Sequence, residues 1–156
     1  MKKITIFALL LVSLICTCLC ACSSSEGKTP ATADVATVIA DSGEFVDLMA
    51  LTDDNIVRRY YGIDLEAIEE YQALVCSNGA LADEIAVFKM KEKDDVEDML
   101  EVVRERQQEL YDSFVDYVPE EINKINNAVI GSNGNYVYFA VCSDASAAKA
   151  AAEGCF

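Results

Sequence analysis

Four of the pairs of adjacent acidic residues are the parts of this sequence most capable of chemistry. Paired carboxylates can act as acid and base in glycoside hydrolysis. Three of the pairs lie where helices are expected to begin, and there negative charge is favourable because it complements the helix dipole. The fourth opens an expected strand, and we interpret it as a solvated strand end. In chain order the pairs are Asp53-Asp54, Asp83-Glu84, Asp94-Asp95 and Glu120-Glu121, of which Asp83-Glu84 is the one at a strand.

The sequence contains no histidine, and this removes two kinds of site. A Ser-His-Asp or Cys-His group needs an imidazole as its base. A zinc site would have to be built from thiolates and carboxylates alone, and no CxxC spacing is present. Asp83-Glu84 also lacks the spaced oxygen ligands of a calcium-binding loop. We therefore expect no metal, no cofactor and no enzymatic activity.

Two arginines, Arg104 and Arg106, lie among acidic residues of the longest expected helix. Ion pairs on the helix surface, such as one between Glu101 and Arg104, are the simpler interpretation. Binding of an anionic ligand is the alternative.

The N-terminus carries the features of a bacterial lipoprotein signal. Lys2 and Lys3 precede an apolar run over residues 4–19, which is typical of a signal peptide. The run ends in Leu-Cys-Ala-Cys-Ser, where the second thiol, Cys22, follows a small residue and can accept a diacylglyceryl group. We predict a signal peptide over residues 1–21 and a lipidated Cys22 with a tether over 22–33. An ordinary secretory signal or an uncleaved membrane anchor is the alternative.

Cleavage there would leave a strongly acidic chain on the outer face of the cytoplasmic membrane. Two of the twelve basic residues would be lost and all 27 acidic residues kept, which gives a net charge of −17. Such a surface repels nucleic acid and anionic lipid head groups. The expected contacts are therefore with the membrane, through the lipid on Cys22, and with a protein of the envelope. Three cysteines would remain as thiols, namely Cys76, Cys142 and Cys155, with a Cys76–Cys142 disulfide as the alternative.

Residues 34–156 predict a single acidic α+β domain. We expect a small antiparallel sheet built from two hairpins, with a long amphipathic helix and shorter helices packed on it. Hydrophobic periodicity and turn signals place strands over 71–76 and 84–90, and over 128–130 and 135–142. The same signals place helices over 34–40, 54–60, 95–117, 119–126 and 145–153.

The last expected strand is apolar on both faces. Its alternation puts Tyr136 and Tyr138 on one face and Val137 and Phe139 on the other. Such a strand is expected to be covered on both sides, by the long helix on one and by the helices around residues 35–39 and 56–60 on the other. Without that second cover, Tyr136 and Tyr138 would form an open aromatic strip, the candidate ligand-binding surface of this sequence.

A set of short motifs resembles one protein family. The motifs are Tyr61-Gly62-Ile63-Asp64, the run from Ala82 to Lys89, Arg104 with Gln108, Tyr117-Val118-Pro119-Glu120, Gly134-Asn135-Tyr136-Val137 and Ser143-Asp144. Together they are similar to the domain of unknown function 4358 family, lipoproteins of Gram-positive, clostridial-type bacteria, over residues 34–153. The resemblance implies one extracytoplasmic domain and carries over no catalytic or ligand residue.

These observations favour a non-enzymatic binding or interaction module displayed at the cell surface. The alternatives are a carboxylate-dependent enzyme acting on an extracellular polymer and an accessory subunit of an envelope or transport complex. A pocket enclosing two carboxylates roughly 5 to 9.5 Å apart would favour the enzyme. An exposed apolar patch would favour the interaction module.

Overall fold

A computed structural model of the chain describes residues 29–156. The predicted signal peptide, residues 1–21, and Cys22 lie outside the described residues. Within the described part, no helix combines the length and apolarity needed to cross a membrane. The elements are α2 (Thr32–Ser42), β1 (Leu48–Ala50), α3 (Asp54–Tyr61), β2 (Ile68–Cys76), β3 (Glu84–Met90), α4 (Val96–Phe114), α5 (Ile122–Asn126), β4 (Val129–Asn133), β5 (Tyr136–Val141) and α6 (Ala145–Glu153).

The strands form one antiparallel sheet in the order β1-β2-β3-β5-β4, which confirms the predicted α+β class. Both predicted hairpins are present, as β2-β3 and β4-β5. They join because β3 pairs with β5, with Glu84 opposite Val141 and Lys89 opposite Tyr136. The three-residue strand β1 adds an edge next to β2. The sequence does not predict β1, because three residues are too few to show an alternating pattern.

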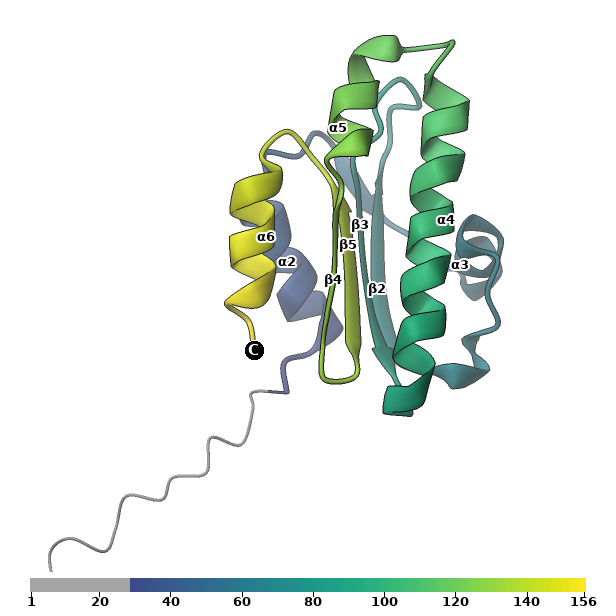
Figure 1. Cartoon of the computed structure of the whole chain (residues 1–156), viewed down its shortest axis with the longest axis vertical. Coiled ribbons are helices and arrows are strands. Elements are labelled where there is room, and N and C mark those ends of the chain that lie inside the picture. The colour runs from purple at the N-terminus through teal and green to yellow at the C-terminus, as the bar shows by residue number, and fades with distance from the viewer. Residues whose placement is uncertain (1–28) are drawn as a thin grey trace, which may run out of the picture.

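Helices cover both faces of the sheet (Figure 1). The face with α4 and α3 buries Val137 and Phe139 of β5, and the face with α2 and α6 buries Tyr136 and Tyr138. The prediction that residues 56–60 cover the tyrosine face is wrong. Val57 of α3 packs in the core on the α4 face, and α6 takes the expected place beside α2.

Several element ends differ from the predicted ones for local reasons. A single 3-10 turn over Leu65–Ala67 leads directly into β2, which begins at Ile68 and not at the predicted residue 71. The long helix α4 starts at Val96, with no side-chain cap, and ends at Phe114. Tyr117 therefore falls outside the buried stripe of α4 and is 71% exposed. The caps at Asp53 and Asp144 form as their residue types indicate, each accepting a backbone N–H.

The second hairpin is tighter than predicted, because Gly131 belongs to β4 and not to the turn. The ring of Tyr138 lies over Gly131 from the neighbouring strand, where a Cβ would come within 2.4 Å of the tyrosine Cζ. Glycine is needed here because the ring occupies the space of a side chain. The turn itself is made by Gly134, which has a left-handed φ of 60°, together with Asn135.

Candidate functional site

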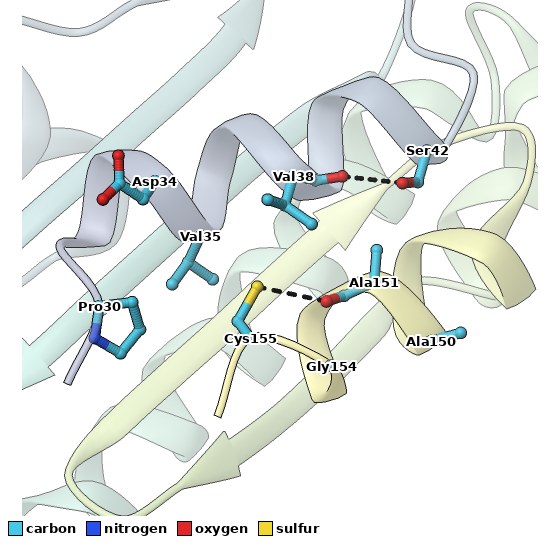
Figure 2. Close-up of a pocket in the computed structure, with 9 residues that line it drawn as sticks. All are labelled: Pro30, Asp34, Val35, Val38, Ser42, Ala150, Ala151, Gly154 and Cys155. Carbon is cyan, nitrogen blue, oxygen red and sulfur yellow. Dashed lines mark hydrogen bonds between the residues drawn. The ribbon is translucent and has the colours of Figure 1, made fainter. Parts of the chain in front are cut away.

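A mainly apolar groove with a volume of about 500 Å³ lies between α2 and α6. Figure 2 shows Val35 and Val38 pointing from α2 toward α6. Val35 is fully buried, whereas Val38 keeps 42% of its surface exposed. The residues that line the groove are Pro30, Asp34, Val35, Val38, Ser42, Ala150, Ala151, Gly154 and Cys155.

Small side chains and local hydrogen bonds give the groove its shape. Ala150 and Ala151 are too short to fill the space beside Val38, so α6 leaves the groove open. The Ser42 hydroxyl donates to the Val38 carbonyl at 2.8 Å, and the Cys155 thiol donates to the Ala151 carbonyl at 3.3 Å. Both polar groups are thereby turned toward the backbone, which leaves an apolar surface in the groove.

The two candidate tyrosines lie behind this groove and not on an open strip. Tyr136 and Tyr138 are 4% and 5% exposed, and Phe156 packs on both rings at 5.0 and 6.4 Å between centroids. The Tyr136 hydroxyl donates to the Pro30 carbonyl at 2.8 Å. Burial raises the pKa of both phenols. The tyrosines are therefore core residues that fasten the two ends of the described chain to the sheet.

The acidic pair Asp83-Glu84 is buried, so its interpretation as a solvated strand end is wrong. The two side chains are 1% and 2% exposed. They open β3, the middle strand of the sheet, and strand alternation sends them to opposite faces. Each therefore meets a different set of partners.

Glu84 points to the α4 face and binds Arg106. The guanidinium Nη2 lies 2.7 Å and Nε 3.0 Å from the carboxylate, and the Tyr61 hydroxyl donates to it at 2.8 Å. Tyr60 lies over the guanidinium at 4.9 Å. Burial opposes the charge of Arg106, but its hydrogen bonds and attraction to Glu84 outweigh burial and raise its pKa.

The predicted surface role of the two arginines is therefore wrong for Arg106, which is only 15% exposed. Arg104 does form a surface ion pair, with Glu97 at 3.3 Å. The sequence contains a signal for this difference between the two arginines. Arg106 lies three residues after Val103 and four before Leu110, so it shares their buried stripe, whereas Arg104 does not.

Asp83 points to the opposite face and binds Lys124 of α5. The Lys124 ammonium lies 2.9 Å from Asp83 and 2.8 Å from Glu121. Glu121 also accepts the Ala82 backbone N–H at 2.9 Å. Burial lowers the pKa of Lys124, but hydrogen bonds from the two carboxylates outweigh it and raise the pKa. These contacts fasten α5 to the end of the sheet.

The arrangement of these acids favours a structural role over acid–base catalysis. Asp83 and Glu84 both line a small pocket of about 140 Å³, but Glu84 is paired with Arg106 and Asp83 shares Lys124 with Glu121. A glycosidase needs its two carboxyl groups free to act on one substrate. Within residues 29–156, no group of three or more candidate ligands could hold a metal ion.

Cys76 and Cys142 are free thiols on strands that β3 separates. Two strand spacings amount to about 9.5 Å, which is more than the roughly 6.8 Å that a disulfide can bridge between Cα atoms. Burial, followed by the charge of Asp83, raises the pKa of Cys142 to about 11. Its thiol therefore packs as a small apolar side chain.

Comparison with known proteins gives one match. A family model described as a domain of unknown function (DUF4358) matches residues 41–142, which is more than half of the chain. No curated protein and no solved structure matches significantly. The matched residues include the whole sheet, α3 to α5 and both buried acids.

Proposed function

This chain belongs to the DUF4358 family of domains of unknown function. We propose that it is a lipid-anchored binding module that holds an envelope protein at the outer face of the cytoplasmic membrane. The observation that carries the proposal is the apolar groove between α2 and α6. Val38 is exposed in it although it is a large apolar side chain. A partner segment seated in the groove would bury Val38 together with the small side chains of α6.

The position of the groove along the chain supports a partner close to the membrane. Pro30 lines the groove, and only seven residue steps separate Thr29 from the predicted lipidation site at Cys22. Seven fully extended steps span at most about 25 Å. The groove would therefore stay near the bilayer, where it meets apolar, membrane-proximal segments of other envelope proteins.

The state of the buried carboxylates supports binding over the alternative of a carboxylate enzyme. Glu84 is engaged by Arg106 and Tyr61, and Asp83 by Lys124. A general acid or base needs access to substrate, and these groups face helices. An accessory subunit of an envelope or transport complex is compatible with the same groove, since its partner would be another protein of the complex.

Site-specific crosslinking in intact cells tests the proposal. A photoreactive amino acid replaces Val38 in the groove or, as a matched control, Tyr117. Tyr117 is also exposed, and it follows α4, the helix that covers the opposite face of the sheet. We expect a discrete protein adduct from position 38 that position 117 does not give. The same adducts from both positions, or none from position 38, would contradict the proposed function.

A second variant tests the contribution of the anchor. Cys22→Ala removes the predicted acceptor of the lipid and should lower the yield of the position 38 adduct, because the anchor raises the local concentration of the protein at the membrane. An unchanged yield would show that the groove binds its partner without membrane attachment.

A further inference from the structure

We infer that the open edge of β1 binds an extended, basic segment of another protein by strand addition. The inference stands on residues 41–77 and depends neither on the groove nor on the lipid anchor. Strand addition uses the unpaired backbone groups of an edge strand for affinity and neighbouring side chains for specificity.

The backbone of β1 leaves hydrogen-bonding groups at the open edge. The Leu51 N–H donates to the Ala73 carbonyl at 2.9 Å, and the Ser77 N–H donates to the Asp47 carbonyl at 3.0 Å. Antiparallel pairing alternates, so residues 47, 49 and 51 bond to β2 while Leu48 and Ala50 direct their N–H and C=O groups away from it. Ala50 is also exposed as a residue.

Apolar side chains are exposed along the same segment. Val46 and Met49 are 48% and 49% exposed. Only Val38 and Tyr117 are other large apolar side chains with comparable exposure among residues 29–156. Two of these four exposed side chains, Val46 and Met49, therefore lie within residues 46–49, beside the open edge of β1.

The backbone before β1 is held in an unusual conformation. Glu44 and Asp47 have left-handed φ angles of 56° and 48°, which non-glycine residues adopt infrequently. Ser77, which directly follows β2, secures this conformation, because its N–H donates to the Asp47 carbonyl and its hydroxyl donates to the Asp47 carboxylate. The edge is therefore preformed, which lowers the entropic cost of binding an extended segment.

The charge around the edge selects a basic occupant. Residues 41–57 contain five acidic residues and no lysine or arginine. None of the five forms an ion pair with a cation of the described chain. A second copy would bring the same acids against them, whereas lysine or arginine would neutralise them. The five are Asp41, Glu44, Asp47, Asp53 and Asp54.

The other edge strand, β4, provides a matched control. Asn133 and Tyr136 close its two-residue turn, so the neighbouring Ser132 directs its N–H outward as Ala50 does. Ser132 and Asn133 are exposed polar residues. This edge has the same backbone groups but none of the exposed large apolar side chains.

The test uses the detergent-solubilised full chain and two fluorescent, end-blocked heptapeptides. One is Lys-Val-Lys-Val-Lys-Val-Lys, and the other replaces each lysine by glutamate. We expect saturable binding of the basic peptide, weakened by added salt, and at least about tenfold weaker binding of the acidic one. On binding, amide hydrogen exchange should slow at Leu48 and Ala50.

Two variants separate strand addition from general attraction of charge. Ala50→Pro removes an outward N–H and should weaken binding about tenfold, whereas Ser132→Pro should leave it unchanged. If Ala50→Pro lowers the melting temperature, amide exchange decides instead: peptide binding should slow exchange at Leu48 and Ala50 and leave exchange at Ser132 unchanged, and equal slowing at all three would overturn the inference. The inference is overturned if neither peptide binds, if both bind equally, or if Ser132→Pro weakens binding as much as Ala50→Pro.

Discussion

The two faces of the sheet are covered by different parts of the chain. The α4 face is closed by a 19-residue helix and by α3, both from the middle of the sequence, over large side chains such as Phe88 and Phe139. The other face is closed by α2 and α6, from the two ends of the described chain, and α6 covers it with alanines. One face is therefore filled by bulky side chains, and the other keeps an open groove between its helices. If the proposed function is correct, stability depends mainly on the α4 face and recognition on the groove between α2 and α6.

The largest expected effect is on the filled face. Arg106→Met leaves Glu84 buried without its cation, and breaking a buried pair in this way costs about 3 to 5 kcal/mol. Arg104→Met is the matched control, because its ion pair with Glu97 is exposed and should contribute less than about 1 kcal/mol. Urea denaturation of both variants measures the difference. Equal free energies of unfolding for the two variants would contradict the assignment of Arg106 to a buried ion pair and Arg104 to a surface one.

Truncation of Tyr138 tests whether the other face also forms a true core. Tyr138→Ala removes a ring that packs on Gly131 and Phe156, and we expect a loss of about 3 kcal/mol in the free energy of unfolding. Thermal and urea denaturation report this loss. A melting temperature unchanged from wild type would show that α2 and α6 do not cover the ring, and would return Tyr138 to the candidates for ligand binding.

Removal of one hydroxyl should have a smaller, more local effect. Tyr136→Phe deletes the donor to the Pro30 carbonyl and should lower stability by about 1 kcal/mol. Amide exchange should rise most at the beginning of α2, next to the groove. Tyr138→Phe is the control, since no hydrogen bond joins the Tyr138 hydroxyl to another group in the described residues. Equal amide exchange rates at the beginning of α2 in the two variants would argue against a stabilising hydrogen bond from Tyr136 to Pro30.

Alkaline pH should lower the stability of the folded domain, because folding keeps the side chains of Cys142 and Tyr71 protonated. Burial is the main cause that raises the pKa of Cys142 from 9.0 to about 11 and of Tyr71 from 10.0 to about 12. The unfolded chain ionises first, so stability is full below about pH 9 and falls as the pH rises toward 12. Cys142→Ala should reduce the fall between pH 9 and 11, and Tyr71→Phe the fall between pH 10 and 12. A pH dependence unaltered by both variants would contradict these assignments.

What could be predicted from the sequence depended on short-range signals. Asp53, Gly62 and Asp144 mark helix ends through contacts with residues at most a few positions away, and the hairpins follow from alternation and turns. The burial of Asp83 and Glu84 depends on partners 41 and 22 residues distant, which no local pattern contains. The burial of the two tyrosines by α6 and the pairing of β1 with β2 at the sheet edge also depend on contacts that no local sequence pattern contains.

In the proposed function, lipid on the sulfur of Cys22 holds the groove between α2 and α6 at the membrane. Intact-mass analysis of the protein extracted from membranes tests this most directly. We predict a protein that begins at Cys22. Its mass should exceed that of the 135-residue peptide, residues 22–156, by a diacylglyceryl group with or without a further acyl chain. This species should be absent in Cys22→Ala. An unmodified mass, or an N-terminus at another residue, would contradict a groove held at the membrane by lipid.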